Sequence, residues 1–233
     1  MLIEEMQAYY EKRAREYDIS MGYDTEDKAR ELEPAIKLTR EILKGRRVLE
    51  LACGPGYWTQ QIAPVVRSVV ATDYNESTLR EARKKNLDSS RVTFEQADAY
   101  KLDQIVGDFD AVFAVDWFAH VPRSRISEFL GSVACRIPKG CPVFFLDQLP
   151  KEGSITEVFD SEGNHIQERI LEDGSKYRVI KHFLDDSEIE DYLCDLDLEF
   201  DVTRMPECRR IALKWRTKFG EQDVPAKSDR SGG

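Results

Sequence analysis

Hydrophobic residues at helical spacing dominate residues 1–45 of the chain. They recur from Tyr9 to Tyr17 and again from Ala29 to Leu43, which indicates helices with one face packed on a core. Gly22 lies between the two runs, and Gly45 follows the second one, where a glycine commonly ends a helix. We therefore predict two helices at the start of the chain.

After Gly45 the spacing changes to short apolar runs that alternate with helical segments. Runs that are apolar throughout are typical of strands in a parallel sheet that is covered on both faces. The predicted strands are Val48–Leu51, Ser68–Thr72, Val92–Gln96, Ala111–Val115 and Val143–Leu146, and the predicted helices lie near residues 58–67, 76–86 and 123–136. This order predicts an α/β fold with a doubly wound sheet.

A β-hairpin is predicted in the last third of the chain, where Glu172–Gly174 separates two extended runs. A type I turn ending in a left-handed glycine places Arg169 opposite Tyr177 and puts Arg169 and Lys181 on the more apolar face. An unpaired cation is costly in such surroundings, so beside a pocket both side chains would bind an anion. Alternatively, both pair with acidic residues on the body of the protein.

The segments after the hairpin complete the predicted domain. A helix is expected near residues 186–196, followed by strands around 199–204 and 209–216 that can pair only antiparallel across their short connection. Residues 1–220 are predicted to form one domain without internal repeats. The polar tail, residues 221–233, is predicted to be disordered.

Composition excludes several classes of partner. The 233 residues include 34 Lys and Arg against 44 Asp and Glu, a formal charge of −10, whereas proteins that bind the nucleic-acid backbone need basic surfaces. No apolar run approaches the ~20 residues of a membrane-spanning helix, and the acidic start is unlike a signal or transit peptide. Five cysteines without a CxxC motif suit reduced thiols. We expect a cytoplasmic protein, monomeric or homodimeric, that binds neither nucleic acid nor membranes.

A glycine-containing turn joins the first predicted strand to a helix, and acidic residues follow the neighbouring strands. Gly54 and Gly56 permit positive φ angles and let a ligand approach the backbone closely. Asp73 closes the second strand and Asp98 follows the third. Because the carboxyl ends of parallel strands meet at one edge of a sheet, we expect these carboxylates and Glu50 to surround one ligand. The simpler alternative is a tight turn with acidic residues nearby by chance.

The acidic residues discriminate between nucleotide cofactors. The third glycine of a dinucleotide-binding motif would fall at Thr59, and carboxylates repel a pyrophosphate. They suit a positively charged nucleoside better. The pattern therefore favours a sulfonium cofactor over NAD.

The segment Glu50–Gly56 resembles the first motif of the class I S-adenosylmethionine-dependent methyltransferases, E/D-x-G-x-G-x-G, with Ala52 in place of the first glycine. The resemblance implies a Rossmann-like seven-stranded sheet with its last strand antiparallel, an N-terminal helical lid over residues 1–45 and an inserted substrate-side hairpin at 153–184. It also implies S-adenosylmethionine as the cofactor and no metal. Tyr10 and Tyr17 match N-terminal aromatic residues that often close over the cofactor in small-molecule members; alternatively, both belong to the buried face of a helix. The implied cofactor-binding residues are Tyr17, Glu50, Ala52, Gly54, Gly56, Trp58, Asp73, Tyr74, Asp98, Ala99 and Asp116.

Three further segments are similar to the phosphonate O-methyltransferase of dehydrophos biosynthesis, namely Gly56–Thr59, Phe113–Pro122 and the hairpin Arg169–Lys181. This similarity covers most of the chain but is too distant to transfer the substrate. The segment Asp116–Ala119 lacks the Asn/Asp-Pro-Pro-Tyr/Phe motif that nucleic-acid amino-methyltransferases typically carry after the fourth strand. A small molecule is therefore the expected acceptor.

The expected reaction is methyl transfer to an oxygen of a small acidic metabolite, a phosphonate or a carboxylate, held by Tyr23, His120, Arg169 and Lys181. Such an oxygen is already ionised at neutral pH and needs no base. A neutral or cationic acceptor, methylated at nitrogen or oxygen, would need His120 as the catalytic base, unless this histidine only packs against the turn that follows it. A third possibility is a non-catalytic domain that binds the cofactor as a sensor.

Overall fold

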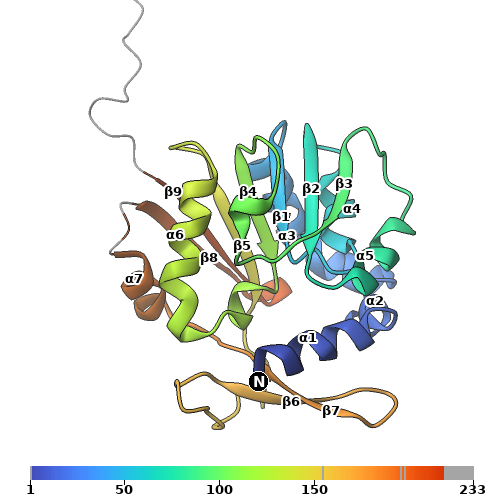
Figure 1. Ribbon diagram of the computed structural model, residues 1–233, viewed down its shortest axis with the longest axis vertical. Helices are drawn as coiled ribbons and strands as arrows, with labels where there is room; N and C mark the ends of the chain where they lie inside the picture. The colour runs from blue at the N-terminus through green and yellow to red at the C-terminus, as the bar shows by residue number, and fades with distance from the viewer. Residues whose placement is uncertain (1, 154, 195, 197, 218–233) are drawn as a thin grey trace, which may run out of the picture.

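The computed structural model describes residues 2–153, 155–194, 196 and 198–217. Its centre is a seven-stranded sheet in the order β3-β2-β1-β4-β5-β9-β8 (Figure 1). Strands β1 to β5 run parallel, whereas β9 is antiparallel to both of its neighbours, β5 and β8. The strands of the sheet are β1 (Arg47–Leu51), β2 (Ser68–Asp73), β3 (Val92–Gln96), β4 (Ala111–Val115), β5 (Val143–Gln148), β8 (Leu198–Met205) and β9 (Arg210–Thr217), and the separate hairpin consists of β6 (Ile166–Ile170) and β7 (Lys176–Ile180). The predicted Rossmann-like sheet with an antiparallel last strand is confirmed.

Helices cover both faces of the sheet because successive strand residues point to opposite sides. Phe113 and Phe144 pack in the core beneath α3, α4 and α5, and their neighbours Val112 and Phe145 pack in the core beneath α6 and α7. The helices are α1 (Leu2–Arg13), α2 (Tyr17–Met21), α3 (Glu26–Leu43), α4 (Tyr57–Ile62), α5 (Glu76–Arg83), α6 (Ile126–Arg136) and α7 (Asp186–Cys194). None of the helices in the described part of the chain is both long enough and apolar enough to cross a membrane.

Helix α1 lies between the sheet and the hairpin (Figure 1). Met6 and Tyr9 of α1 are buried in a small core that includes Val179 of β7. The Glu5 carboxylate also accepts a hydrogen bond from the guanidinium of Arg178, with 2.9 Å between Oε2 and Nη2. Apolar packing and an ion pair therefore join the helix and the hairpin into one layer.

The N-terminal region contains three helices, so the prediction of two was wrong in number. Helix α1 ends at Arg13 and α2 begins at Tyr17, although the apolar spacing continues across this break. Gly22 ends α2 with a φ of 72°. The side chain of Thr25 then caps α3 by accepting a hydrogen bond from the backbone N–H of Lys28.

The hairpin has the predicted register, with Arg169 opposite Tyr177, but its strands are shorter than the extended runs suggest. Before β6, the Asp160 carboxylate accepts hydrogen bonds from the N–H groups of Glu162 and Asn164 and closes a turn in place of a longer strand. The predicted helix 58–67 likewise ends early, at Ile62, because a proline at position 64 has no N–H to continue it. The predicted disorder of residues 221–233 lies outside the described residues.

Candidate active site

The turn after β1 adopts a backbone conformation that glycine favours. Gly54 and Gly56 have φ angles of 56° and 79°, and Ala52 has a φ of 50°. A Cβ atom on Gly56 would lie 3.1 Å from the Cβ of Ala82, so α4 and α5 approach each other closely there. Ala52 therefore occupies a left-handed position at which the methyltransferase motif has glycine, at a cost of about 1–2 kcal/mol.

Asp73 and Asp98 lie at the carboxyl ends of β2 and β3, as predicted. The Asp73 carboxylate accepts hydrogen bonds from the N–H of Gly54 at 3.0 Å and of Asn75 at 2.8 Å, and burial raises its pKa. Asp98 accepts from the N–H of Tyr100 at 2.9 Å. These hydrogen bonds fix the orientation of both carboxylates.

Asp116 follows β4 and forms a buried ion pair with Arg210, with 2.6 Å between Oδ1 and Nη1. The two side chains are 7% and 4% exposed. Burial raises the pKa of Asp116, but the charges of Arg210 and Lys181 outweigh it, and the pKa is lowered. The lowered pKa keeps the carboxylate ionised. Its second oxygen, Oδ2, is buried without a hydrogen-bond partner in the described structure and is therefore free to accept a hydrogen bond from a ligand.

A cavity of about 230 Å³ lies at this edge of the sheet, roofed by α1. Nine of the predicted site residues line it, namely Tyr17, Ala52, Gly54, Asp73, Tyr74, Asp98, Ala99, Asp116 and His120. Ile3, Met6, Gln7 and Tyr10 contribute from α1. The N-terminal helix therefore forms part of the cavity wall, and the lid over residues 1–45 stays a prediction.

A smaller cavity of about 30 Å³ continues beyond the Gly54 loop. Tyr23, Glu50 and Trp58 line it together with Asp116. Glu50 is 1% exposed, its Oε2 atom is buried without a hydrogen-bond partner in the described structure, and burial raises its pKa to about 8. Glu50 is therefore largely protonated at neutral pH in this state.

The imidazole of His120 is held on both sides. Its Nδ1 atom contacts the carbonyl oxygen of Ile180, and its Nε2 atom lies 3.0 Å from the hydroxyl of Tyr10. A carbonyl can only accept, so Nδ1 carries the proton and Nε2 accepts from Tyr10. Burial and the charge of Lys181 lower the pKa of His120 to about 3, which keeps it neutral.

The two predicted anion-binding cations have different surroundings. Lys181 is 4% exposed and forms no ion pair with the described residues, although its charge lowers the pKa of Asp116 and His120. Arg169 is exposed and donates to Gln167 Oε1 at 2.6 Å. The register thus keeps Arg169 on the same face of the hairpin as the buried Gln167 and Val179, but Arg169 is exposed there whereas Lys181 is buried.

Comparisons with known proteins agree with this geometry. Residues 48–140 match the profile of a family described as "Methyltransferase domain". The ubiquinone biosynthesis O-methyltransferase of Pseudomonas aeruginosa (strain LESB58) is 33% identical over 85 residues, which are 36% of this chain and 37% of that enzyme. The chain thus spans little more than a third of the length of this curated relative.

Two solved structures are similar over nearly the whole chain. The DhpI–SAH complex has a TM-score of 0.74 and 30% identity, covering 93% of this chain and 97% of DhpI. The DhpI–SAM–HEP complex has a TM-score of 0.75 and 32% identity, covering 92% and 97%. The chain belongs to the S-adenosylmethionine-dependent methyltransferases.

The cavity of this methyltransferase fits the cofactor that its family uses, S-adenosylmethionine. A sulfonium and an ammonium group need nearby negative charge, and the ionised carboxylate of Asp116 keeps one unpartnered oxygen buried beside the loop. Positive φ angles at Gly54 and Gly56 leave the backbone open to a ligand. NAD, the competing cofactor, would place its pyrophosphate among these acids.

Sequence reasoning missed two charged residues of the methyltransferase site. Arg210, which pairs with Asp116, begins β9, 94 residues further along the chain, and no local pattern marks it. Asp147 lies near the end of β5, and burial raises its pKa to about 6. An acidic residue ending a parallel strand is the signal that identified Asp73, and the same rule applied to β5 identifies Asp147.

Proposed function

We propose that this methyltransferase methylates an oxygen of a small acidic metabolite, a phosphonate or a carboxylate. The observation that carries this proposal is Lys181, a buried ammonium without an ion pair among the described residues, beside the cavity that His120 and Asp116 line. A buried charge is costly unless a counter-ion offsets it, and an acidic acceptor supplies that counter-ion.

Different residues around the cavity would bind the cofactor and the acceptor. Asp73 would accept from the ribose hydroxyls, and the ionised Asp116 would face the positive methionine end. Lys181 would hold the acid group of the acceptor, with Arg169 at the more open side. When bound, S-adenosylmethionine supplies a methyl group activated by the sulfonium.

The transfer step needs positioning rather than proton removal. An ionised acid oxygen supplies the electron pair for the new bond to the methyl carbon, and the electron pair of the broken bond stays on sulfur. No proton has to leave the acceptor. Tyr10 and His120 then serve to close and orient the site, which suits an imidazole that burial keeps neutral.

The alternative, a neutral or cationic acceptor deprotonated by His120, has one observation in its favour. Nε2 of His120 is unprotonated and meets Tyr10, which lines the same cavity. However, a group with a pKa of about 3 is a weak base for removing a proton from an alcohol or an ammonium. We therefore prefer the acidic acceptor.

An acceptor panel tests the choice. The protein is incubated with S-adenosylmethionine and ethylphosphonate, propionate, propanol or propylamine, and methylated products are detected by mass spectrometry. Methyl esters of the acids, without products from propanol and propylamine, are expected. Products from the alcohol or the amine alone, formed at a rate that drops sharply in His120→Gln, would establish the alternative. Binding of S-adenosylmethionine without any product would favour a sensor.

A further inference from the structure

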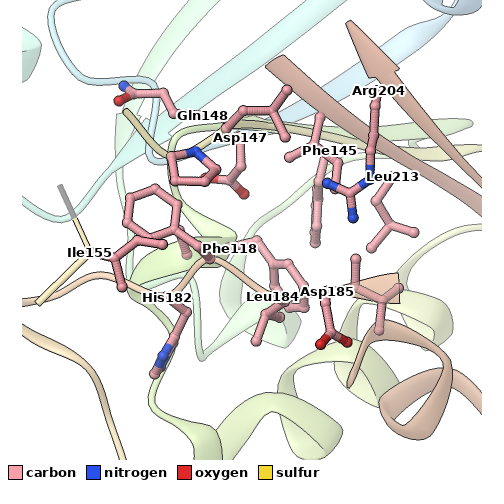
Figure 2. Close-up of a pocket in the computed structure, with 16 residues that line it drawn as sticks. Phe118, Phe145, Asp147, Gln148, Ile155, His182, Leu184, Asp185, Arg204 and Leu213 are labelled. Atoms are coloured by element: carbon pink, nitrogen blue, oxygen red, sulfur yellow. The ribbon is translucent and has the colours of Figure 1, made fainter. Parts of the chain in front are cut away.

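A second cavity, of about 220 Å³, lies beside the sheet next to β5 and β9 (Figure 2). Its walls are largely apolar and include Phe118, Phe145, Leu184, Ile189, Ile211 and Leu213. In Figure 2 the carboxylate of Asp147 points into the space between these side chains, whereas the imidazole of His182 points away from it. The cavity is therefore a largely apolar chamber whose walls include two carboxyl groups, those of Asp147 and Asp185.

The short helix η2 (Phe118–His120) separates this chamber from the cofactor cavity. Phe118 and Ala119 line the second cavity, and His120 lines the first. The side chains of this one 3₁₀ turn thus line both the second cavity and the cofactor cavity.

Lys181 follows Ile180, whose carbonyl oxygen contacts His120 of the cofactor cavity, and precedes His182 and Phe183, which line the second cavity. On the side of the second cavity, its Nζ atom is 5.7 Å from the ring centre of Phe183, and its charge lowers the pKa of Asp147. On the side of the cofactor cavity, the same charge lowers the pKa of Asp116 and of His120. An acid group bound to Lys181 would therefore have the methyl donor on one side and the apolar chamber on the other.

The mouth of the second cavity is apolar as well. Ile155 lines it and is 56% exposed, and Val158 and Phe159 nearby in sequence are 59% and 54% exposed. Of these three residues, Ile155 is the one that lines the cavity, and its exposed apolar side chain suits the entry of an apolar ligand. Arg204 on the wall formed by β8 is paired with Asp186, so it leaves the chamber without a free cation there.

We propose that the second cavity holds the apolar body of the acceptor, which is therefore an amphipathic acid with its acid group at Lys181. This inference rests on the proposed function and narrows its substrate class. The walls between Phe118 and Leu213 would bury the hydrocarbon or aromatic part, while the acid group stays within reach of the methyl donor. Neither the family match nor the charges around Lys181 require an acceptor with such a body.

A homologous series of acceptors tests this inference. The KM values of n-alkylphosphonates from ethyl to octyl are measured at saturating S-adenosylmethionine. Burial of each added methylene is expected to lower the KM two- to fourfold until the cavity is filled. In Ile211→Trp the indole occupies the cavity, and the KM is expected to lose its dependence on chain length. Calorimetric binding of S-adenosylmethionine to this variant confirms that it is folded.

A second pair of variants tests the inference with substitutions at exposed positions, which do not disturb the packing of the core. Ile155→Glu places a charge at the mouth of the cavity and is expected to raise the KM of octylphosphonate at least fivefold. Val106→Glu is the matched control, because Val106 is 85% exposed and lines neither cavity. Equal effects of the two substitutions would overturn the assignment of the mouth.

The outcomes separate the two proposals. If ethylphosphonate is methylated but longer chains give no lower KM, the amphipathic acceptor is excluded and the proposed function remains. If neither propionate nor a phosphonate of any length is bound or methylated, while S-adenosylmethionine binds, both proposals are wrong. A KM that falls with chain length in the wild type and stays flat in Ile211→Trp supports both.

Discussion

The hydroxyl of Tyr10 lies 3.0 Å from Nε2 of His120 and joins the N-terminal helix to the turn after β4. The two rings also meet edge to face, with centroids 5.7 Å apart. Because α1 also binds the hairpin through Glu5 and Arg178, this helix joins the cofactor cavity that it lines to both the hairpin and the turn after β4.

The first prediction concerns this contact. Tyr10→Phe removes the hydroxyl and leaves Nε2 of His120 buried without its donor, so we expect the free energy of unfolding to fall by about 1–2 kcal/mol. Urea denaturation measures the change. Tyr192→Phe is the control, because the Tyr192 hydroxyl makes only a 3.3 Å contact with Arg123 and its loss should cost under about 0.5 kcal/mol. An unchanged stability in Tyr10→Phe would show that the contact contributes nothing.

The second prediction isolates the charge of Lys181. Lys181→Gln removes the proposed partner of the acceptor, and we expect the KM of ethylphosphonate to rise about 10- to 100-fold, because a charge-assisted hydrogen bond is worth about 1.5–3 kcal/mol. The affinity for S-adenosylmethionine should not weaken, since removing a cation does not disfavour a cationic ligand. Steady-state kinetics and calorimetry measure the two quantities.

The matched control is Lys176→Gln on the same hairpin. Lys176 pairs with Glu168 at 3.0 Å, and its side chain is 63% exposed, so its loss should leave the acceptor KM within about twofold. The anion-binding role of Lys181 would be excluded if the two variants behaved alike.

The local sequence pattern predicts the strands of this protein and the carboxylate of Asp73 at the end of β2. It does not predict the contacts around Asp116 and His120. Apolar runs locate β1 to β5 within a residue or two, and the acidic residue after a strand is enough to place Asp73 at the site. Arg210 reaches Asp116 only because β9 inserts antiparallel beside β5, and Tyr10 reaches His120 only because α1 packs on the hairpin. Such contacts depend on tertiary packing, which periodicity does not encode.

The third prediction uses the buried carboxyl of Glu50. Its pKa of about 8 in the folded protein exceeds the usual value near 4.5, so the folded state binds the proton more tightly than the unfolded chain. The stability contributed by the protonated group is complete below about pH 4.5 and is lost as the pH rises towards 8. Glu50→Gln keeps the shape without the ionisation, and we expect it to be more stable than the wild type at pH 8–9, by at most about 5 kcal/mol.

Denaturation curves of both proteins between pH 5 and 9 check this expectation. The difference between them should grow with pH across this range. Glu95→Gln on β3 is the control, since that side chain is not fully buried and should show no comparable dependence. A difference that stays constant with pH would mean that Glu50 ionises normally in the folded state.

The last prediction concerns Ala52, whose φ of 50° places a residue with a Cβ atom in the left-handed region. Ala52→Gly relieves about 1–2 kcal/mol of backbone strain, and the greater freedom of glycine in the unfolded chain costs about 0.4–1 kcal/mol in return. We therefore expect a net stabilisation of about 0.5–1 kcal/mol in urea denaturation. Asn86→Gly is the control, because Asn86 has the same φ of 50° but asparagine tolerates this conformation, so the gain there should be smaller. A destabilised Ala52→Gly would show that the alanine methyl group packs in the loop strongly enough to outweigh the strain.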